Sequence, residues 1–217
     1  MTNQLPRALL LDLDGTLIDS EPIHRAAYRA FFAQRGWDVT DLSAFTGRRA
    51  QDVFASVPGP WSEGDPEELA AAVVACTPSE AAPEPVAGAQ ALIEAAASHD
   101  VRVAVVTSAA PPWAERALYD VLGVGQHVNV VVTAHDVVDG KPDPTGFTLA
   151  CERLHVSPAE CVAVEDSPAG VAAAVAAGVG NVYGLASTHA PGALLEAGAV
   201  AVYDHLGELA TEVSLTF

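Results

Sequence analysis

Positively charged residues are scarce in this chain of 217 residues, and lysine is almost absent. Lysine and arginine together number 10 against 28 aspartates and glutamates, which gives a formal net charge of −18 at pH 7. Such an acidic chain argues against binding to nucleic acids or to anionic membranes through charge. The one lysine is Lys141, and because arginine fills every other basic position, this position is expected to need a lysine.

Cysteine is also rare and shows no pattern of pairing. Cys76, Cys151 and Cys161 are scattered along the chain and odd in number. This arrangement predicts neither a disulfide framework nor a metal site built from paired cysteines. Each cysteine is expected to be a small buried hydrophobic side chain.

Segments for export or membrane insertion are missing as well. The N-terminus has no basic stretch followed by an apolar stretch and a cleavage site, so we expect no export signal. Residues 168–188 carry no charge, but their glycines predict a helix, a turn and a strand instead of a membrane span. The sequence therefore indicates a soluble, cytoplasmic protein.

Hydrophobic residues make up 50% of the chain, enough to bury a sizeable core. Short Val- and Ala-rich runs alternate with helical patterns, which is typical of an α/β fold with a parallel sheet covered on both faces. The fold expected is a Rossmann-like three-layer core. Strands are predicted at residues 8–11, 101–106, 128–132, 161–164, 182–185 and 200–202, and the main helices at 86–98, 112–122, 144–154 and 168–177.

Residues 20–85 interrupt this alternation. A helical pattern covers residues 20–35 and stops at Gly36, and a second helix start follows at Asp65. No convincing strand appears between residues 37 and 85. We therefore predict a catalytic α/β core formed by residues 1–19 and 86–217, with residues 20–85 inserted as a small α-helical cap domain.

Polar residues gather where the predicted strands end, which is where open parallel sheets bind ligands. Four carboxylates and one ammonium do not share a small site easily, because like charges either raise the pKa values of the carboxyl groups or require a cation. A hard divalent ion with oxygen ligands, Mg²⁺ by default, would meet this requirement. The residues concerned are Asp12, Asp14, Thr107, Ser108, Lys141, Glu165 and Asp166.

Four motifs in this order resemble those of the haloacid dehalogenase superfamily of phosphatases and phosphotransferases. They are DLDGTL at 12–17, VVTSA at 105–109, GKPDP at 140–144 and VEDSPAG at 164–170. The match runs along the whole chain, with the helical segment between the first two motifs. This arrangement is similar to the subgroup of β-phosphoglucomutase and small sugar phosphatases, and four ordered motifs are far more specific than one.

The resemblance implies four catalytic residues. Asp12 would be the nucleophile that forms an aspartyl-phosphate, which divides one difficult displacement into two easier ones. Asp14 would protonate the leaving alkoxide and then deprotonate the attacking water. Thr107 and Lys141 would hold the oxygens of the transferring phosphoryl group.

The resemblance also implies a Mg²⁺ site and a phosphate cradle. The metal ligands would be the carboxylates of Asp12 and Asp166 and the main-chain carbonyl of Asp14. Glu165 would contribute through a water molecule or as a neighbour of these ligands. The backbone N–H groups expected to complete the phosphate site lie near Gly15, Ser108 and Ala109.

The cap is expected to select the substrate. Gly47, Arg48 and Arg49 resemble the family's Gly-x-Arg cap segment, so Arg49 either contacts substrate or begins a solvated helix. His24 falls where mutase-like relatives carry a histidine near the general acid, although the residue type favours an exposed or structural histidine over a catalytic one. Glu21 is the remaining cap candidate for substrate binding.

Differences between this sequence and particular members of the family argue against some of the family's activities. Asp14 disfavours the dehalogenase members, which lack this carboxylate. Residues 20–85 contain no lysine, which argues against the phosphonoacetaldehyde hydrolase type and weakens a β-phosphoglucomutase assignment. The function predicted is a Mg²⁺-dependent phosphatase for a small phosphorylated metabolite, a sugar or polyol phosphate.

Two alternatives stay open at this stage. A phosphomutase of the β-phosphoglucomutase type would isomerise its substrate and need a bisphosphate activator. A non-catalytic phospho-aspartate module similar to signalling receivers would also use aspartate, threonine and lysine, although DxDGT on the first strand counts against it. No nucleic-acid or membrane partner is expected, and the protein would act as a monomer or small homo-oligomer.

Overall fold

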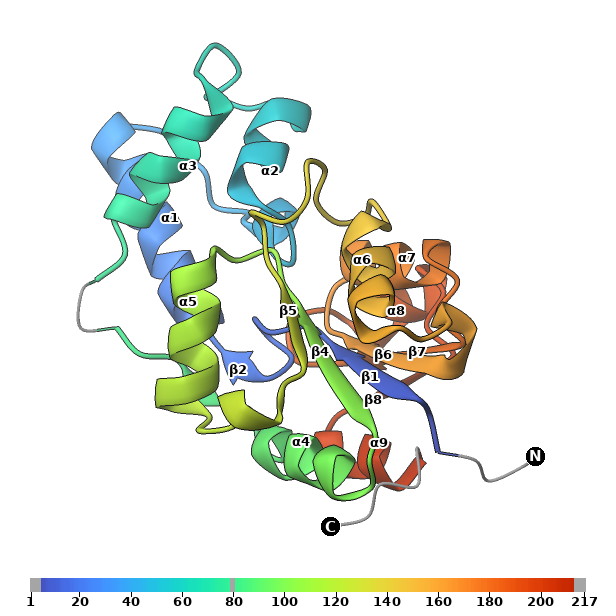
Figure 1. The fold of residues 1–217 in the computed structure, drawn as a ribbon. Helices are drawn as coiled ribbons and strands as arrows, with labels where there is room; N and C mark the ends of the chain where they lie inside the picture. Colours follow the sequence, from blue (N-terminus) through green and yellow to red (C-terminus); the bar gives the residue numbers. More distant parts are fainter. Residues whose placement is uncertain (1–4, 79–80, 213–217) are drawn as a thin grey trace.

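A computed structural model describes residues 5–78 and 81–212 of the chain (Figure 1). Within these residues a six-stranded sheet has the order β5-β4-β1-β6-β7-β8, and every neighbouring pair is parallel. The central strands are built almost entirely from buried aliphatic residues, as a sheet covered on both faces requires. The strands are β1 (Ala8–Leu11), β4 (Arg102–Val106), β5 (Val130–Val132), β6 (Cys161–Glu165), β7 (Asn181–Leu185) and β8 (Ala201–Tyr203).

Helices cover both faces of the sheet, and side-chain alternation along β1 divides the core into two clusters. Leu9 and Leu11 pack with α4, α5 and α9, whereas Leu10 packs with α6, α7 and α8. The three-layer α/β fold predicted from the sequence is confirmed. The helices are α4 (Ala89–Ser98), α5 (Pro111–Arg116), α6 (Thr145–Leu154), α7 (Pro168–Ala176), α8 (Pro191–Glu196) and α9 (Leu206–Glu212).

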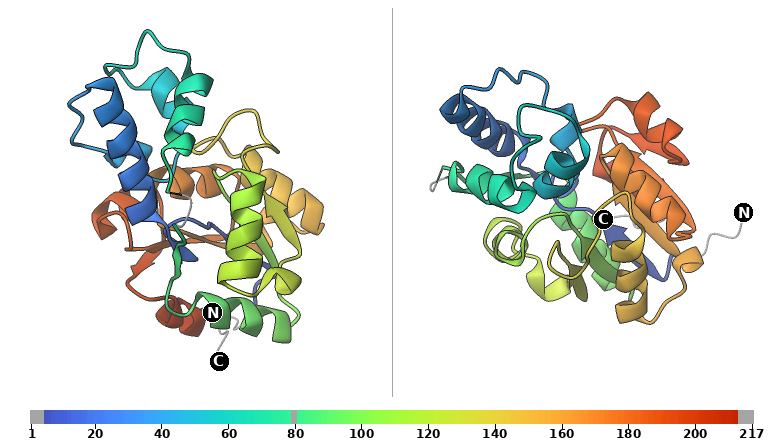
Figure 2. Two further views of the ribbon diagram at one scale, coloured as in Figure 1. Left: turned by 90° about the vertical axis from the view of Figure 1, so that its left-hand side faces the viewer. Right: turned by 90° about the horizontal axis from the view of Figure 1, so that it is seen from above.

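Helices α1 (Glu21–Arg35), α2 (Ala50–Ser56) and α3 (Pro66–Ala75) form a separate group. Figures 1 and 2 show them at the opposite end of the molecule from α4 and α9. They share a third hydrophobic cluster, in which aromatic rings such as Phe32 and Trp61 stack on one another. This cluster has residues only from the segment between β1 and α4, so these helices carry a core of their own.

A two-residue ribbon marks where the chain leaves the sheet region and returns to it. Strand β2 (Ile18–Asp19) pairs antiparallel with β3 (Glu84–Pro85). The sequence did not predict either strand, because two residues give no periodicity to detect. Helix α9, after the last predicted strand, was also missed.

Other predicted boundaries differ by small amounts. The helix predicted at 112–122 is α5 followed by a wider π-helical turn at Ala117–Val121, where the hydrogen-bonding pattern changes. Residues 168–188 form α7 and β7 joined by a turn, as predicted. Within the described residues, every helix is too short or too polar to cross a membrane. Short 3₁₀ turns occupy Ser43–Phe45, Gly125–His127 and Pro158–Glu160.

Candidate active site

The central strands carry the predicted site residues to one edge of the sheet. Asp12 follows β1, Thr107 follows β4, and Glu165 and Asp166 lie at the end of β6. Strands β4 and β6 flank β1 in parallel register, so their carboxyl ends meet. Each of these side chains is at least nine-tenths buried.

Lys141 lies at the centre of this group. Its Nζ atom donates to Asp12 Oδ1 at 2.5 Å, to Glu165 Oε1 at 2.5 Å and to the Val106 carbonyl at 2.9 Å. Burial alone would lower the pKa of the Lys141 ammonium, but the two carboxylates outweigh burial and the net effect is a raised pKa. The three acceptors surround a single nitrogen here, which suits a compact ammonium and not a planar guanidinium, whose donors are spread over three nitrogens.

Three carboxylates surround this single ammonium. One oxygen each from Asp12, Glu165 and Asp166 lies within 4.8 Å of the others. Burial raises the pKa of Asp12 well above its usual value, although Lys141 acts in the opposite direction. Burial and the neighbouring Glu165 raise the pKa of Asp166 to about 7. When all three carboxylates are ionised, the cluster carries two more negative charges than Lys141 neutralises. Its charge and its oxygen donors therefore fit a divalent cation such as Mg²⁺.

Asp166 is held by hydroxyl groups that the sequence reasoning missed. Thr188 donates to Asp166 Oδ2, and Thr16 donates to Asp166 Oδ1 at 3.4 Å. Gly15 approaches the same carboxylate with a φ of +89°, a backbone conformation that favours glycine. The motif strings contain no signal for Thr188, because it follows a different strand, β7.

The predicted backbone donors are partly engaged already. The Gly15 N–H donates to the Ile18 carbonyl at 2.7 Å, and the Ala109 N–H donates to Thr107 Oγ1 at 3.0 Å. Ser108 Oγ donates to the Gly47 carbonyl at 3.4 Å, which links β4 to the loop before α2. In this conformation Gly15 and Ala109 therefore order the turns around the site and do not offer free N–H groups to a phosphate.

Glu165 is fixed on its second oxygen as well, where Ser167 donates to Oε2 at 3.1 Å. Gly170, on α7, packs so closely on this carboxylate that an added methyl group would overlap it.

Gly170→Ala is therefore expected to displace Glu165 and destabilise the fold by about 1–3 kcal/mol through overpacking. Chemical denaturation measures the change. Gly192→Ala is the matched control, since nothing lies near that position and the free energy of unfolding should hold or rise slightly.

Asp14 faces a different set of partners. Ser20 donates to Asp14 Oδ1 at 2.6 Å, and the indole N–H of Trp113 donates to the same oxygen at 2.9 Å. Thr107 Oγ1 lies 3.5 Å from the other oxygen, Oδ2. Trp113 was not among the predicted site residues, because one tryptophan near a helix start carries no recognisable pattern.

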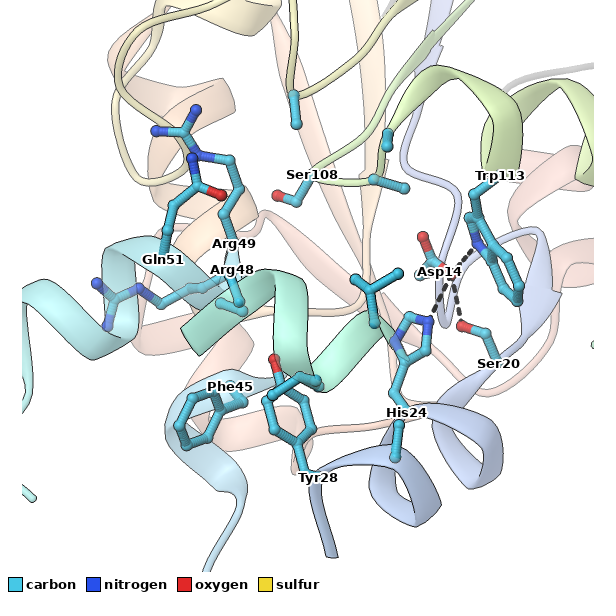
Figure 3. A pocket seen from close by; sticks show the side chains of 18 of the residues that line it. Asp14, Ser20, His24, Tyr28, Phe45, Arg48, Arg49, Gln51, Ser108 and Trp113 are labelled. Atoms are coloured by element: carbon cyan, nitrogen blue, oxygen red, sulfur yellow. Dashed lines mark hydrogen bonds and ion pairs between the residues drawn. The ribbon is translucent and has the colours of Figure 1, made fainter. Parts of the chain in front are cut away.

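A cavity of about 580 Å³ lies between the strand ends and helices α1–α3. Asp12 and Asp14 line its floor, and side chains from α1, α2 and α3 line the opposite wall. Figure 3 shows Tyr28 and Ser108 facing this space from the two sides. The cavity is large enough for a small organic phosphate and brings it against the acidic cluster.

The three predicted cap residues all line the cavity, with different surroundings. His24 lies near Asp14, with Nε2 3.8 Å from Oδ1, and is 40% exposed. Glu21 pairs with Arg25 at 2.6 Å and accepts from Thr46 at 3.3 Å.

The Arg49 guanidinium is buried and already bonded. It donates to both oxygens of Asp52, at 2.7 and 2.9 Å, and to the carbonyls of Val137 and Val138 at 3.3 and 2.6 Å. Arg49 thus joins α2 to the loop that precedes Lys141. In this conformation it binds protein groups, unlike the substrate contact considered from the sequence.

Comparison with known proteins decides the family. The model of the haloacid dehalogenase-like hydrolases matches residues 6–178. The chain belongs to this family. Validoxylamine A 7'-phosphate phosphatase of Streptomyces hygroscopicus subsp. limoneus is 40% identical over 195 residues, 88% of this chain and 91% of the relative. Hexitol phosphatase A of Escherichia coli is 34% identical over 175 residues, 79% of this chain and 80% of the relative.

A solved structure has the same architecture as this chain. CbbY from Rhodobacter sphaeroides, in complex with xylulose 1,5-bisphosphate, superposes with a TM-score of 0.76 at 26% identity, covering 94% of this chain and 96% of that one. These comparisons confirm the predicted family. They also confirm the predicted enzyme class, a hydrolase of phosphoric monoesters.

Proposed function

We propose that this protein is a Mg²⁺-dependent phosphatase for a small phosphorylated sugar or polyol, acting through an aspartyl-phosphate on Asp12. The observation that carries the proposal is the contact of Asp12 with Lys141, at the floor of a cavity that Asp14 also lines. The names of the two relatives, which act on validoxylamine 7'-phosphate and on hexitol phosphate, support a polyhydroxylated substrate.

In the first step, a carboxylate oxygen of Asp12 attacks phosphorus. The new bond joins that oxygen to phosphorus, and the bond from phosphorus to the ester oxygen breaks. Asp14 gives its proton to the leaving oxygen, so the alcohol departs neutral. Lys141 and Thr107 hold the phosphoryl oxygens while charge builds on them.

In the second step, a water molecule attacks the phosphorus of the aspartyl-phosphate. Asp14, now ionised, takes the proton from this water and is restored to its acid form. The bond between Asp12 and phosphorus breaks, which releases inorganic phosphate and returns Asp12 as a carboxylate. Two displacements thus replace one that would need water to attack a phosphate dianion directly.

A divalent cation fits the deficit of positive charge in the cluster. The carboxylates of Asp12 and Asp166 and the main-chain carbonyl of Asp14 would hold it, with Glu165 beside them. When bound, Mg²⁺ neutralises charge on the phosphoryl group and helps to orient it. Glu165 has a second task, because its bonds to Lys141 and Ser167 fix the ammonium beside Asp12.

Residues 20–85 act in this proposal as a cap that closes over the substrate. Three contacts support this role: Ser108 with Gly47, and Arg49 with the carbonyls of Val137 and Val138. A closed cap excludes water before phosphoryl transfer and lets cap residues choose the alcohol. Glu21 and His24 line the cavity where substrate hydroxyls would lie.

The proposal is tested by a panel of hexose, hexitol and cyclitol phosphates. We expect release of inorganic phosphate together with the free alcohol from at least one member. Conversion of a sugar phosphate into its isomer, dependent on a bisphosphate activator, would identify a phosphomutase instead. A long-lived phospho-aspartate without turnover of any ester would identify a receiver-like module.

Metal removal gives a separate prediction. Chelation with EDTA should abolish phosphate release, because the cluster then carries uncompensated negative charge where a phosphate must bind. Added Mg²⁺ should restore activity, and titration calorimetry should detect Mg²⁺ binding to the wild-type protein. Asp166→Asn should weaken that binding, whereas Asp41→Asn, in the exposed turn before Ser43–Phe45, should not. Full activity after exhaustive chelation would contradict the metal requirement.

A further inference from the structure

The carboxylate of Asp14 is held asymmetrically. Ser20 and Trp113 both donate to Oδ1, at 2.6 and 2.9 Å, and His24 approaches the same oxygen at 3.8 Å. Among the residues that the structure describes, the remaining oxygen, Oδ2, has one hydrogen-bonding neighbour, the hydroxyl of Thr107 at 3.5 Å. Figure 3 shows Ser20, His24 and Trp113 converging on Asp14 from one side, while one carboxylate oxygen turns away from them.

The two donors differ in what they permit. A serine hydroxyl can donate or accept, but an indole N–H can only donate. The oxygen facing Trp113 therefore remains an acceptor whether the carboxyl group is ionised or neutral. The proton of a neutral Asp14 then belongs on the oxygen that Trp113 does not occupy, which is Oδ2.

We propose that Trp113 is a positioning residue for the reaction, which fixes Asp14 so that Oδ2 carries and delivers the proton. Ser20 assists from the start of α1, and the His24 ring packs against the indole with centroids 5.6 Å apart. This inference rests on the proposed function, in which Asp14 protonates the leaving alcohol. It adds a residue from α5 that lies outside the four motifs described above.

The arrangement also connects Asp14 to both parts of the molecule. Trp113 belongs to α5 and packs against the core cluster, whereas Ser20 and His24 belong to the start of the cap segment. Asp14 is therefore held by one donor from each part, Trp113 and Ser20.

The test compares two leaving groups in single turnover with enzyme in excess. A hexitol phosphate needs a proton on its leaving oxygen, whereas p-nitrophenolate leaves as a stable anion. Trp113→Phe is expected to slow alcohol release from hexitol phosphate about tenfold or more, and to change the single-turnover rate of p-nitrophenolate release by less than about twofold. Trp37→Phe, the same change in the aromatic cluster of α1–α3, should alter neither rate.

Ser20→Ala is a second, independent variant. The Ser20 side chain makes no helix-capping hydrogen bond, so its loss removes the contact with Asp14 and leaves α1 capped as before. It should show the same selective loss, and circular dichroism should show both variants folded. Equal slowing of both esters, or no slowing of either, would overturn the role of Trp113. Failure of the wild-type protein to release phosphate from either ester would instead contradict the proposed function itself.

Discussion

Asp12→Asn should lose phosphatase activity by about 10⁴-fold or more, because an amide oxygen is a far weaker nucleophile than a carboxylate. The substitution keeps an oxygen in place for Lys141, so the geometry around Nζ should be retained. The measurement is phosphate release under saturating substrate. Mass spectrometry after acid quench should find the aspartyl-phosphate on Asp12 of the wild-type protein and not at this position in the variant.

The fold of this variant should not weaken. Asp12 is one of three buried carboxylates beside a single ammonium, and removing one negative charge relieves repulsion in the cluster. Asp204→Asn, an exposed position after β8, is the matched control and should keep full activity. Turnover retained by Asp12→Asn would refute the nucleophilic mechanism.

Lys141→Met should affect both stability and catalysis. The methionine fills similar space but leaves Asp12 and Glu165 buried without their shared donor. Removing one partner of a buried ion pair costs on the order of 3–5 kcal/mol. The loss of a phosphoryl-binding charge should lower kcat about 10²- to 10³-fold in addition.

Two measurements separate these effects. Chemical denaturation gives the free energy of unfolding, and activity is compared at a temperature where circular dichroism shows both proteins folded. Lys141→Arg should remain impaired, because a planar guanidinium does not reproduce the three contacts to Asp12, Glu165 and Val106. Wild-type activity in the methionine variant would contradict the assigned role.

The residues at strand ends were accessible to prediction from the sequence. Asp12, Thr107 and Asp166 each follow a short aliphatic run, and parallel strands bring such positions to one edge whatever the details of packing. Lys141 was identified by its motif and by its isolation among arginines. The placement of such residues depends only on where the strands lie in the sequence, which the hydrophobic pattern indicates.

Contacts made by side chains across the molecule were not accessible in this way. Trp113 lies 99 residues from Asp14 in the chain, and Arg49 lies 88 residues from the Val137 carbonyl. Such contacts depend on rotamers and on the approach of loops, which leave no periodic trace in the sequence. The same reason explains why the sequence did not predict the contacts of Arg49 with Asp52 and with the backbone carbonyls.

The pairing of β2 with β3 sets the entrance and exit of the inserted segment side by side. The described helices between them share an aromatic core of their own, and none of their residues pairs with the six-stranded sheet. An insert joined at adjacent points can be exchanged or redesigned as a cassette while the strands beneath keep their alignment. The two-strand ribbon thus marks where residues 20–83 could be replaced without interrupting any strand of the six-stranded sheet.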